Sequence, residues 1–430
     1  MELVDINIFN LDYYRDYGIP HNQFKLLRKI DPVHWQEEEQ DPDRPEISPT
    51  GYWAITRHED IKQISRDPAT FSSNVAGTNI KNYTLKEQAV LKRMIINLDP
   101  PEHVQLRRLV KGGFTPRMIQ KLEPRIKRVC RDVFDSVIEK GNCEFVKEVT
   151  SEIPLIILCD LMGVPQADRR KIYDWSNQLI GFDDPENPTH PDEALAVSME
   201  LWRYANNLGN ERRKCPMDDI TSILVHAEIE GNRLSQLDYD IFFLLLSVAG
   251  NETTRTAMTQ GTIALLEHPA QWDLLKSNPE LYIDSAVEEI LRWVTPIIHF
   301  RRTATKDIEL RGKTIKEGDK VVLYYPSANR DEDVFTDPDV FDITRKHNPH
   351  LTFGDGEHFC LGSVLARYEL KHFFWELATR MPDISLAGPY LRLRSNFVNG
   401  IKSMPVNFTP GVKIGWDSAD DDSGSWTLQK

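Results

Sequence analysis

The longest hydrophobic pattern in the chain predicts a helix over residues 235–266. Within it, residues 241–248 read Ile-Phe-Phe-Leu-Leu-Leu-Ser-Val, so nearly every side of the helix is apolar there. A helix without a polar face is stable in water only where other protein surrounds it. We therefore expect this segment to run through the centre of the molecule.

Apolar residues at helical spacing predict several further helices. These cover residues 20–31, 58–66, 116–140, 151–162, 168–179, 192–213, 284–293 and 363–380. Alternation of apolar and polar residues predicts short strands over residues 52–56, 297–305 and 320–325. The predicted fold class is therefore mainly α with small β-sheet regions.

Two stretches between these elements have no regular pattern. Residues 71–97 are mostly irregular, and a long loop of this kind in an enzyme often covers a pocket. Residues 181–191 contain three prolines within seven positions, which no helix accommodates. We expect this second stretch to be a mobile connection between two helices, forming a lid where a bulky substrate enters.

A glycine-rich loop precedes the helix predicted over residues 363–380. Residues 353–362 read Phe-Gly-Asp-Gly-Glu-His-Phe-Cys-Leu-Gly. Gly354 and Gly356 allow backbone conformations that a Cβ obstructs, and Gly362 leaves room beside the sulfur of Cys360. The loop thus delivers one cysteine to the start of a helix.

The position of Cys360 suggests a chemical role. Free backbone N–H groups and the positive end of the helix both favour a thiolate over a thiol. A buried thiolate needs a cation, and haem iron is one partner that a lone cysteine can serve. The alternative is a buried structural cysteine in an ordinary loop.

A second motif spans residues 98–109, where Asp99 is a suitable helix cap and Pro100 a suitable first-turn residue. His103 and Arg107 follow at i and i+4, so both project from one face of the helix. They could converge on one anion, such as a carboxylate of a porphyrin. The alternative is a solvated helix face.

The central helix contains Ala249-Gly250-Asn251-Glu252-Thr253-Thr254, where glycine, an acid and two hydroxyls interrupt the apolar pattern. The Thr253 hydroxyl can bond the carbonyl of Ala249 and open a local groove. The alternative is a kink tolerated for packing. On the helix predicted over 284–293, Glu289 and Arg292 stand side by side at i and i+3.

Composition and charge exclude several classes of protein. The chain has 430 residues without a linker, and its net charge of −14 disfavours nucleic acid as a partner. Five widely spaced cysteines without a Cys-x-x-Cys pair argue against a disulfide framework or zinc site and favour a reducing cytoplasm. We expect no signal peptide and no membrane span. Residues 416–430 read as an acidic, disordered tail, with a recognition tail as the alternative.

The spacing Phe-x-x-Gly-x-His-x-Cys-x-Gly resembles the haem-binding loop of the cytochrome P-450 superfamily. Three other stretches agree in type and order: the His103/Arg107 helix, the turn at residues 249–254, and the Glu289/Arg292 pair. The resemblance spans residues 10 to 410. It implies a single catalytic domain over residues 1–415, shaped as a triangular prism, with haem b between the long central helix and the cysteine-loop helix.

The resemblance also implies roles for individual residues. Cys360 is the axial ligand of the iron, while Thr253 positions oxygen and water and Glu252 relays protons. The other cofactor-binding residues are His103, Arg107, Arg302, His358, Phe353, Gly354, Gly362, Ala249 and Gly250. Arg345 completes a structural lock with Glu289 and Arg292. The substrate pocket includes Val248, Ala249, Ile297, Ile298, His299, Phe397 and Val398; His299 as a catalytic base is the alternative to a pocket wall.

The implied reaction inserts one oxygen atom from O₂ into a C–H bond. Residues 300–305, 327–331 and 249–254 are similar to those of soluble bacterial enzymes that hydroxylate terminal methyl groups of sterol side chains and methyl-branched lipids, although terpene and fatty-acid enzymes share parts of them. A ferredoxin and its reductase would supply electrons to a monomeric enzyme. The proposed docking patch is Arg108, Lys111, Arg117, Lys346 and His347. A peroxide-driven enzyme and a haem-thiolate sensing protein remain alternatives.

Overall fold

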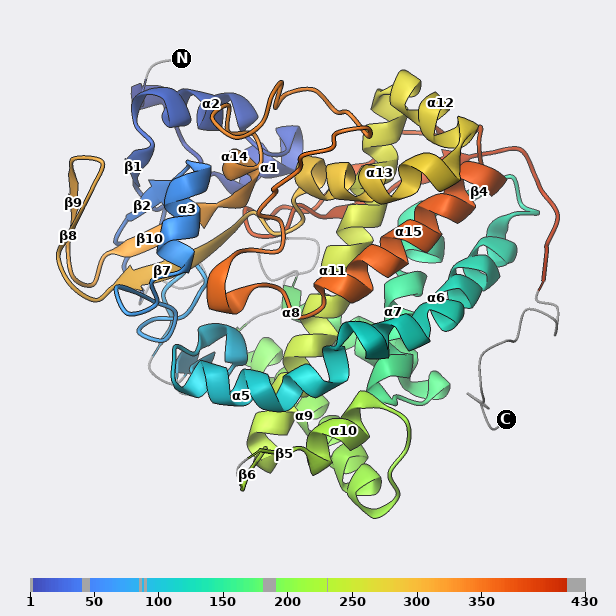
Figure 1. Cartoon of the computed structure of the whole chain (residues 1–430), viewed down its shortest axis with the longest axis horizontal. Coiled ribbons are helices and arrows are strands. Elements are labelled where there is room, and N and C mark those ends of the chain that lie inside the picture. Colours follow the sequence, from blue (N-terminus) through green and yellow to red (C-terminus); the bar gives the residue numbers. More distant parts are fainter. Residues whose placement is uncertain are drawn as a thin grey trace.

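The computed structural model describes residues 3–40, 47–84, 87–88, 91–180, 191–229 and 231–415. At its centre lies helix α11 (Gln236–Glu267), which crosses the molecule obliquely (Figure 1) and contacts helices α7, α8, α9, α13 and α15. Ser235 caps it by accepting a hydrogen bond from the backbone N–H of Asp238. The predicted central helix is confirmed.

The other elements form a helical body and a smaller sheet region. The longer helices are α2 (His21–Ile30), α3 (His58–Ser65), α5 (Glu102–Lys111), α6 (Pro116–Val137), α7 (Glu152–Met162), α8 (Arg169–Ile180), α9 (Pro191–Lys214), α12 (Pro269–Ser277), α13 (Pro279–Val294) and α15 (Ser363–Arg380). Shorter ones are α1 (Leu11–Tyr17), α10 (Ile220–His226), α14 (Tyr325–Ala328) and the 3-10 turn η6 (Gly356–His358).

A mixed five-stranded sheet has the order β1-β2-β10-β7-β3 and lies on the left in Figure 1. Its strands are β1 (Val33–Gln36), β2 (Tyr52–Ile55), β3 (Phe71–Ser72), β7 (His299–Ala304) and β10 (Lys320–Tyr324). Strand β10 runs parallel to β2 and antiparallel to β7, with Val321 opposite Arg302. Because side chains alternate across a strand, Arg301 and Arg302 project to opposite faces of the sheet.

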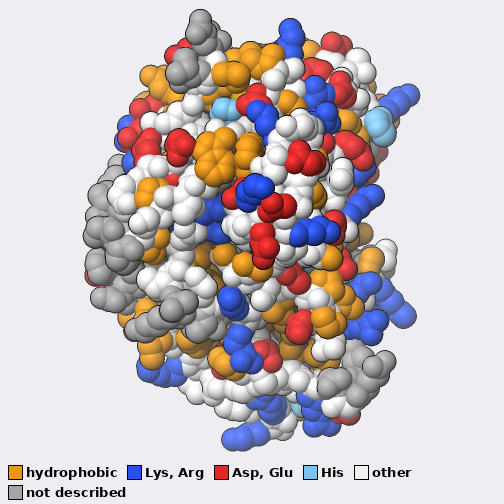
Figure 2. All heavy atoms as spheres, turned by 90° about the vertical axis from the view of Figure 1, so that its left-hand side faces the viewer, with side chains coloured by type: hydrophobic (Ala, Val, Ile, Leu, Met, Phe, Trp, Pro, Cys, Tyr) orange, Lys and Arg blue, Asp and Glu red, His pale blue; other side chains and the backbone are white. Residues whose placement is uncertain are grey.

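The remaining strands form four small sheets. They are β4 (Asn142–Glu144), β5 (Glu228–Ile229), β6 (Asn232–Arg233), β8 (Ile308–Leu310), β9 (Lys313–Ile315), β11 (Ser385–Leu386), β12 (Leu391–Arg392), β13 (Ile401–Ser403) and β14 (Pro405–Asn407). The face in Figure 2, which includes the β8–β9 hairpin, carries acidic and basic side chains side by side. Ion pairs such as Lys316 with Asp307 account for part of this mixture.

Helix α15 passes in front of α11 in Figure 1 and packs against α6 and α13. Its bounds are those predicted from the sequence. Helix α13 begins five residues earlier than predicted, because Pro279 occupies its first turn and Asn278 caps it. The predicted lid connection over 181–190 and the tail from 416 lie outside the described residues.

Two structural features concern the described part of the chain alone. No helix there is long and apolar enough to cross a bilayer. The five cysteines are free thiols, and the described residues contain no His, Cys, Asp or Glu cluster suited to a metal ion. These findings leave the lone Cys360 as the thiol whose surroundings matter most.

Candidate active site

The loop before α15 holds Cys360 in a tight backbone arrangement. Gly354 and Gly356 have φ angles of +72° and +69°, the left-handed region expected of glycine. A Cβ on Gly356 would lie 2.3 Å from the carbonyl oxygen of Ser65, so the loop packs directly on the end of α3. The backbone N–H of Cys360 donates to the carbonyl of Phe353 at 2.9 Å. The loop thus places the sulfur at the start of α15, as predicted.

The environment of Cys360 opposes ionisation in the protein alone. Burial raises the pKa of this thiol, while a hydrogen bond from the backbone of Gly362 and the charges of Arg107 and Arg367 lower it without overcoming the burial. The backbone and charge effects favour the thiolate, but desolvation outweighs them, in keeping with the need of a buried thiolate for a cation. A further cation at the sulfur is required, and a Cβ on Gly362 would meet no atom within 4 Å, which leaves space there.

The acid–alcohol segment lies within α11, which continues as a helix through it, and the predicted Thr253 hydrogen bond is present. The Thr253 hydroxyl donates to the carbonyl of Ala249 at 2.8 Å. Ala249 is exposed and Val248, Gly250 and Thr253 are half-buried, although they lie in the middle of a central helix. These residues form an accessible strip on a helix that also contacts α15.

Glu252 faces a partner that the sequence interpretation missed. Its buried carboxylate pairs with Arg255 one turn further along α11, and Arg255 also donates to Asn177 on α8 at 3.2 Å. Burial lowers the pKa of Arg255, but the Glu252 carboxylate more than offsets this and the net shift is upward. The i, i+3 spacing of acid and arginine was the available signal.

Four nitrogen donors gather beside the cysteine loop, and we name them the donor cluster: His103, Arg107, Arg302 and His358. The rings of His103 and His358 lie 4.3 Å apart between centroids. Burial, followed by the charge of Arg107, lowers the pKa of His103 to about 4. Burial, followed by Arg302, lowers the pKa of His358 to about 2. Both histidines are therefore neutral at pH 7.

The two arginines of the donor cluster bond only carbonyl groups among the described residues. Arg107 donates to the carbonyl of Phe359, and the buried Arg302 donates to that of Arg301 at 2.8 Å. Neither forms an ion pair with a described carboxylate, and both ring nitrogens of His103 are buried without a hydrogen bond. Donors arranged in this way fit an anionic group such as the carboxylates of a porphyrin. The chain therefore fits a haem at this site.

Asp99 does not cap α5 as the sequence suggested. Pro101 occupies the cap position and makes no side-chain bond there. The Asp99 carboxylate instead accepts hydrogen bonds from Ser72 and from the backbone N–H of Ser73, the latter at 2.8 Å. The hydroxyl of Ser73 lies 3.3 Å from Nε2 of His358. Asp99 thus ties the irregular loop to the donor cluster.

The predicted lock is present, and we use that name for Glu289, Arg292, Arg345 and Asn348. Glu289 and Arg292 are fully buried and joined at 2.7 and 2.8 Å. Arg345 and the amide of Asn348 donate to Glu289 at 3.1 and 3.0 Å. Arg292 also donates to backbone carbonyls of the 329–340 segment. The sequence did not reveal Asn348, since no regular spacing links it to the pair.

The residues predicted for the substrate pocket divide into two groups. Ile297 and Phe397 are half-buried, whereas Ile298, His299 and Val398 are buried. His299 packs between the rings of Tyr324 and Phe397, and burial lowers its pKa to about 3. The assignment of all these residues to a substrate pocket stays a prediction, and the exposure of the first group and of the strip on α11 is compatible with it.

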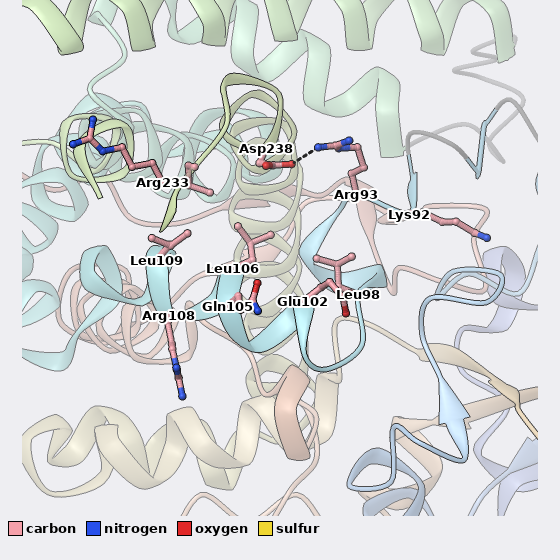
Figure 3. A pocket seen from close by; sticks show the side chains of 11 residues that line it. Lys92, Arg93, Leu98, Glu102, Gln105, Leu106, Arg108, Leu109, Arg233 and Asp238 are labelled. Atoms are coloured by element: carbon pink, nitrogen blue, oxygen red, sulfur yellow. Dashed lines mark hydrogen bonds and ion pairs between the residues drawn. The ribbon is translucent and has the colours of Figure 1, made fainter. Parts of the chain in front are cut away.

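A separate cavity of 420 Å³ lies on the outer side of α5. Figure 3 shows Leu98, Leu106 and Leu109 along it and the Arg93–Asp238 ion pair across it, at 3.0 Å. None of the residues predicted to bind the cofactor, the substrate or oxygen lines this cavity. Arg108 of the predicted docking patch does line it, and its side chain points away from the Arg93–Asp238 ion pair (Figure 3). It is therefore not the candidate active site.

A central helix with an acid–alcohol turn, facing a glycine loop with one cysteine, defines a haem-thiolate enzyme. Residues 197–378 match the Cytochrome P450 family model. A steroid C26-monooxygenase of Rhodococcus jostii is 45% identical over 91% of this chain and 82% of that protein. A methyl-branched lipid omega-hydroxylase of Mycobacterium tuberculosis is 40% identical over 95% of both chains.

A solved structure has the same fold. The Mycobacterium marinum cytochrome P450 in complex with pseudoionone superposes with a TM-score of 0.86 at 37% identity, covering 95% of this chain and 99% of that one. The chain belongs to the cytochrome P450 family. It is a haem-thiolate monooxygenase that hydroxylates hydrophobic substrates.

Proposed function

We propose that this enzyme hydroxylates a terminal methyl group of a sterol side chain or of a methyl-branched lipid. The observation that carries the proposal is the accessible strip at Ala249 and Thr253 on the α11 turn, in a chain that fits a haem at Cys360. The activities of the steroid and lipid relatives support this substrate class. A methyl group at the end of a narrow apolar side chain could reach such a strip.

Haem b would be held by this chain on both faces. Cys360 would ligate the iron, with Phe353, Gly354 and Gly362 on its side and Ala249 and Gly250 on the opposite side. The donor cluster would bind the propionates. When bound, the haem iron with its thiolate ligand supplies the activation of O₂ that allows one oxygen atom to enter a C–H bond.

Thr253 and Glu252 would manage protons at this site. The Thr253 hydroxyl already bonds the Ala249 carbonyl, so it is oriented on the accessible side of the helix. Glu252 is a buried acid held by Arg255, and its release from that ion pair would let it carry protons inward. Arg255 would then set how readily the carboxylate is available.

Electrons would come from a ferredoxin and its reductase, acting on a monomeric enzyme in the cytoplasm. The five residues of the docking patch, Arg108, Lys111, Arg117, Lys346 and His347, are all exposed. Basic side chains suit an acidic partner, and such steering weakens as salt rises. The rate of reduction by a ferredoxin should therefore fall with ionic strength; a rate independent of salt would contradict the patch.

The first experiment compares product formation with a ferredoxin and reductase against peroxide alone. A monooxygenase requires the reductase system, a peroxygenase works with peroxide, and a sensing protein gives no product with either. Thr253→Ala should retain haem but divert reducing equivalents to peroxide. The control is Thr256→Ala, which removes a buried hydroxyl without a partner one turn away. Equal coupling in both variants would remove Thr253 from the mechanism.

The second experiment identifies the substrate and the ligand. Sterols, methyl-branched fatty acids and terpenes are screened for the optical shift that follows loss of water from the iron. The proposal expects shifts with the first two groups and terminally hydroxylated products. Cys360→Ser should abolish the red-shifted band of the reduced carbon monoxide complex, and retention of that band would refute Cys360 as the ligand.

A further inference from the structure

An aromatic side chain stands at the surface immediately before the cysteine. Phe359 is 42% exposed, which is unusual for a phenylalanine in a loop with acidic and histidine neighbours. Its carbonyl accepts the hydrogen bond from Arg107, and its N–H donates to the carbonyl of Gly356 at 3.1 Å. The backbone is thus fixed while the ring remains accessible.

The ring is also held in place. It lies 6.3 Å from the ring of Phe353, between centroids, in a tilted arrangement. The backbone that carries the ring is fixed as well, because the loop rests on the end of α3 through Gly356 and Ser65. An exposed aromatic ring that is already ordered loses little conformational entropy when a partner covers it.

The helix that bonds the backbone of Phe359 carries further basic residues. Arg107 bonds its carbonyl, and Arg108 and Lys111 follow on α5 with exposed side chains. Arg108 points away from Leu106 and Leu109, out of the cavity on the other side of the helix (Figure 3).

Two carboxylates belong to the same loop. Asp355 is neutralised by Arg66, whose side chain is 60% exposed. Glu357 lies 3.9 Å from Nδ1 of His103. Arg107, Arg108 and Lys111 thus outnumber Glu357, the one carboxylate of the loop that no arginine or lysine of the described residues neutralises.

We propose that Phe359 is the central aromatic anchor of the surface that binds the acidic electron donor. The inference rests on the proposed function, because it presupposes an external ferredoxin. Binding energy in protein interfaces concentrates in a few central residues, often aromatic, surrounded by polar groups that exclude water. Phe359 is bonded to the residue proposed as the iron ligand, so a partner seated on it lies at the point of electron entry.

The test measures ferredoxin binding to the haem-loaded enzyme by calorimetry, with [2Fe–2S], [3Fe–4S] and [4Fe–4S] ferredoxins as probes. Phe359→Ala should raise the Kd about 10- to 30-fold at every salt concentration. Its dependence on ionic strength should match that of the wild type, since no charge changes. Arg108→Gln should instead flatten that dependence.

Matched variants separate an anchor from a general effect. Tyr17→Ala removes another exposed aromatic, 73% exposed on α1, and should leave ferredoxin binding unchanged. Phe359→Leu keeps an apolar side chain and should weaken binding less than Phe359→Ala does. The position of the reduced carbon monoxide band reports whether each variant keeps its thiolate ligand. If Phe359→Ala loses haem, ferredoxin binding is compared between Phe359→Leu and Phe359→Gln. The apolar leucine should then bind ferredoxin more tightly than the polar glutamine.

The outcomes distinguish the two proposals. If no ferredoxin binds the wild type, the proposed electron donor is wrong and the anchor falls with it. If the wild type binds and Phe359→Ala binds equally well, the anchor is overturned while the donor stands. Weaker binding of Phe359→Ala with an unchanged carbon monoxide band supports the anchor.

Discussion

The lock and the donor cluster are both buried groups of charged and polar side chains, yet only one is complete in the chain itself. In the lock, Glu289 receives hydrogen bonds from Arg292, Arg345 and Asn348. Every charge there has an opposite charge or a carbonyl beside it. The lock therefore contributes to folding without any ligand.

In the donor cluster, the positive groups outnumber the acceptors. Arg107 and Arg302 have only carbonyl partners among the described residues, and His103 has no hydrogen bond at either ring nitrogen. Burying unmatched donors costs free energy. The difference teaches that a buried polar group can mark either a structural element or a ligand site, and that the balance of donors and acceptors distinguishes them.

The largest expected effect comes from breaking the lock. Glu289→Ala leaves Arg292 buried without its carboxylate, which should lower the free energy of unfolding by about 3–5 kcal/mol. Urea unfolding of the haem-free protein measures this. The control is Asp284→Asn, on the same helix as Glu289. It removes an exposed ion pair to Lys371 of α15 and should cost no more than about 1 kcal/mol. Equal losses would mean that the lock is not special.

In the donor cluster we expect a smaller effect, on haem affinity and not on the stability of the haem-free protein. Arg302→Gln removes a buried cation that lacks a carboxylate partner, so the haem-free protein should lose no stability. Haem affinity should fall about 10- to 100-fold, because a charge-assisted hydrogen bond contributes about 1.5–3 kcal/mol. Haem transfer to apomyoglobin provides the measurement. Arg292→Gln, in the lock, is the comparison and should destabilise the haem-free protein. If Arg302→Gln destabilised the haem-free protein as well, Arg302 would have a structural role like that of Arg292.

The smallest effect is a change with pH. The folded-state pKa of His103 is about 4, below the ordinary value of 6.5, because burial and then Arg107 disfavour the charged ring. The unfolded chain therefore binds the proton first, and stability falls as pH decreases from 6.5 toward 4. The slope from this residue is at most about 1.4 kcal/mol per pH unit.

His103→Gln should reduce that slope in the haem-free protein. Carboxylates that titrate in the same range affect the wild type and the variant alike, so the difference between their unfolding free energies isolates the histidine. His347→Gln, at an exposed position, is the control. Identical pH profiles for wild type and His103→Gln would show that His103 is not desolvated.

Local geometry was predictable from the sequence. The bounds of α15 depend on the periodicity of that helix and on the signals at its ends. The bond from Thr253 to Ala249 and the Glu289–Arg292 pair each join residues one turn apart on a single helix. Arg345 was identified through the family resemblance, and the structure places it on Glu289. The docking patch and the roles of the site residues stay predictions.

Two contacts in the structure were not expected from the sequence. Asp99 has the residue type of a cap, but its carboxylate accepts hydrogen bonds from the Ser72 hydroxyl and the Ser73 backbone N–H instead. Glu252 was interpreted as a free relay acid, although Arg255 holds it. In both cases a competing partner decided the outcome.

By itself the sequence determined the central helix, the glycine loop and the identity of the lone cysteine that the loop presents, because these follow from side-chain periodicity and backbone freedom. Only the tertiary structure decided that burial raises the pKa of Cys360 and that four donors from three distant segments meet where neither arginine has a carboxylate partner among the described residues. Desolvation and charge balance are sums over everything packed around a group. They exist only once the chain has folded.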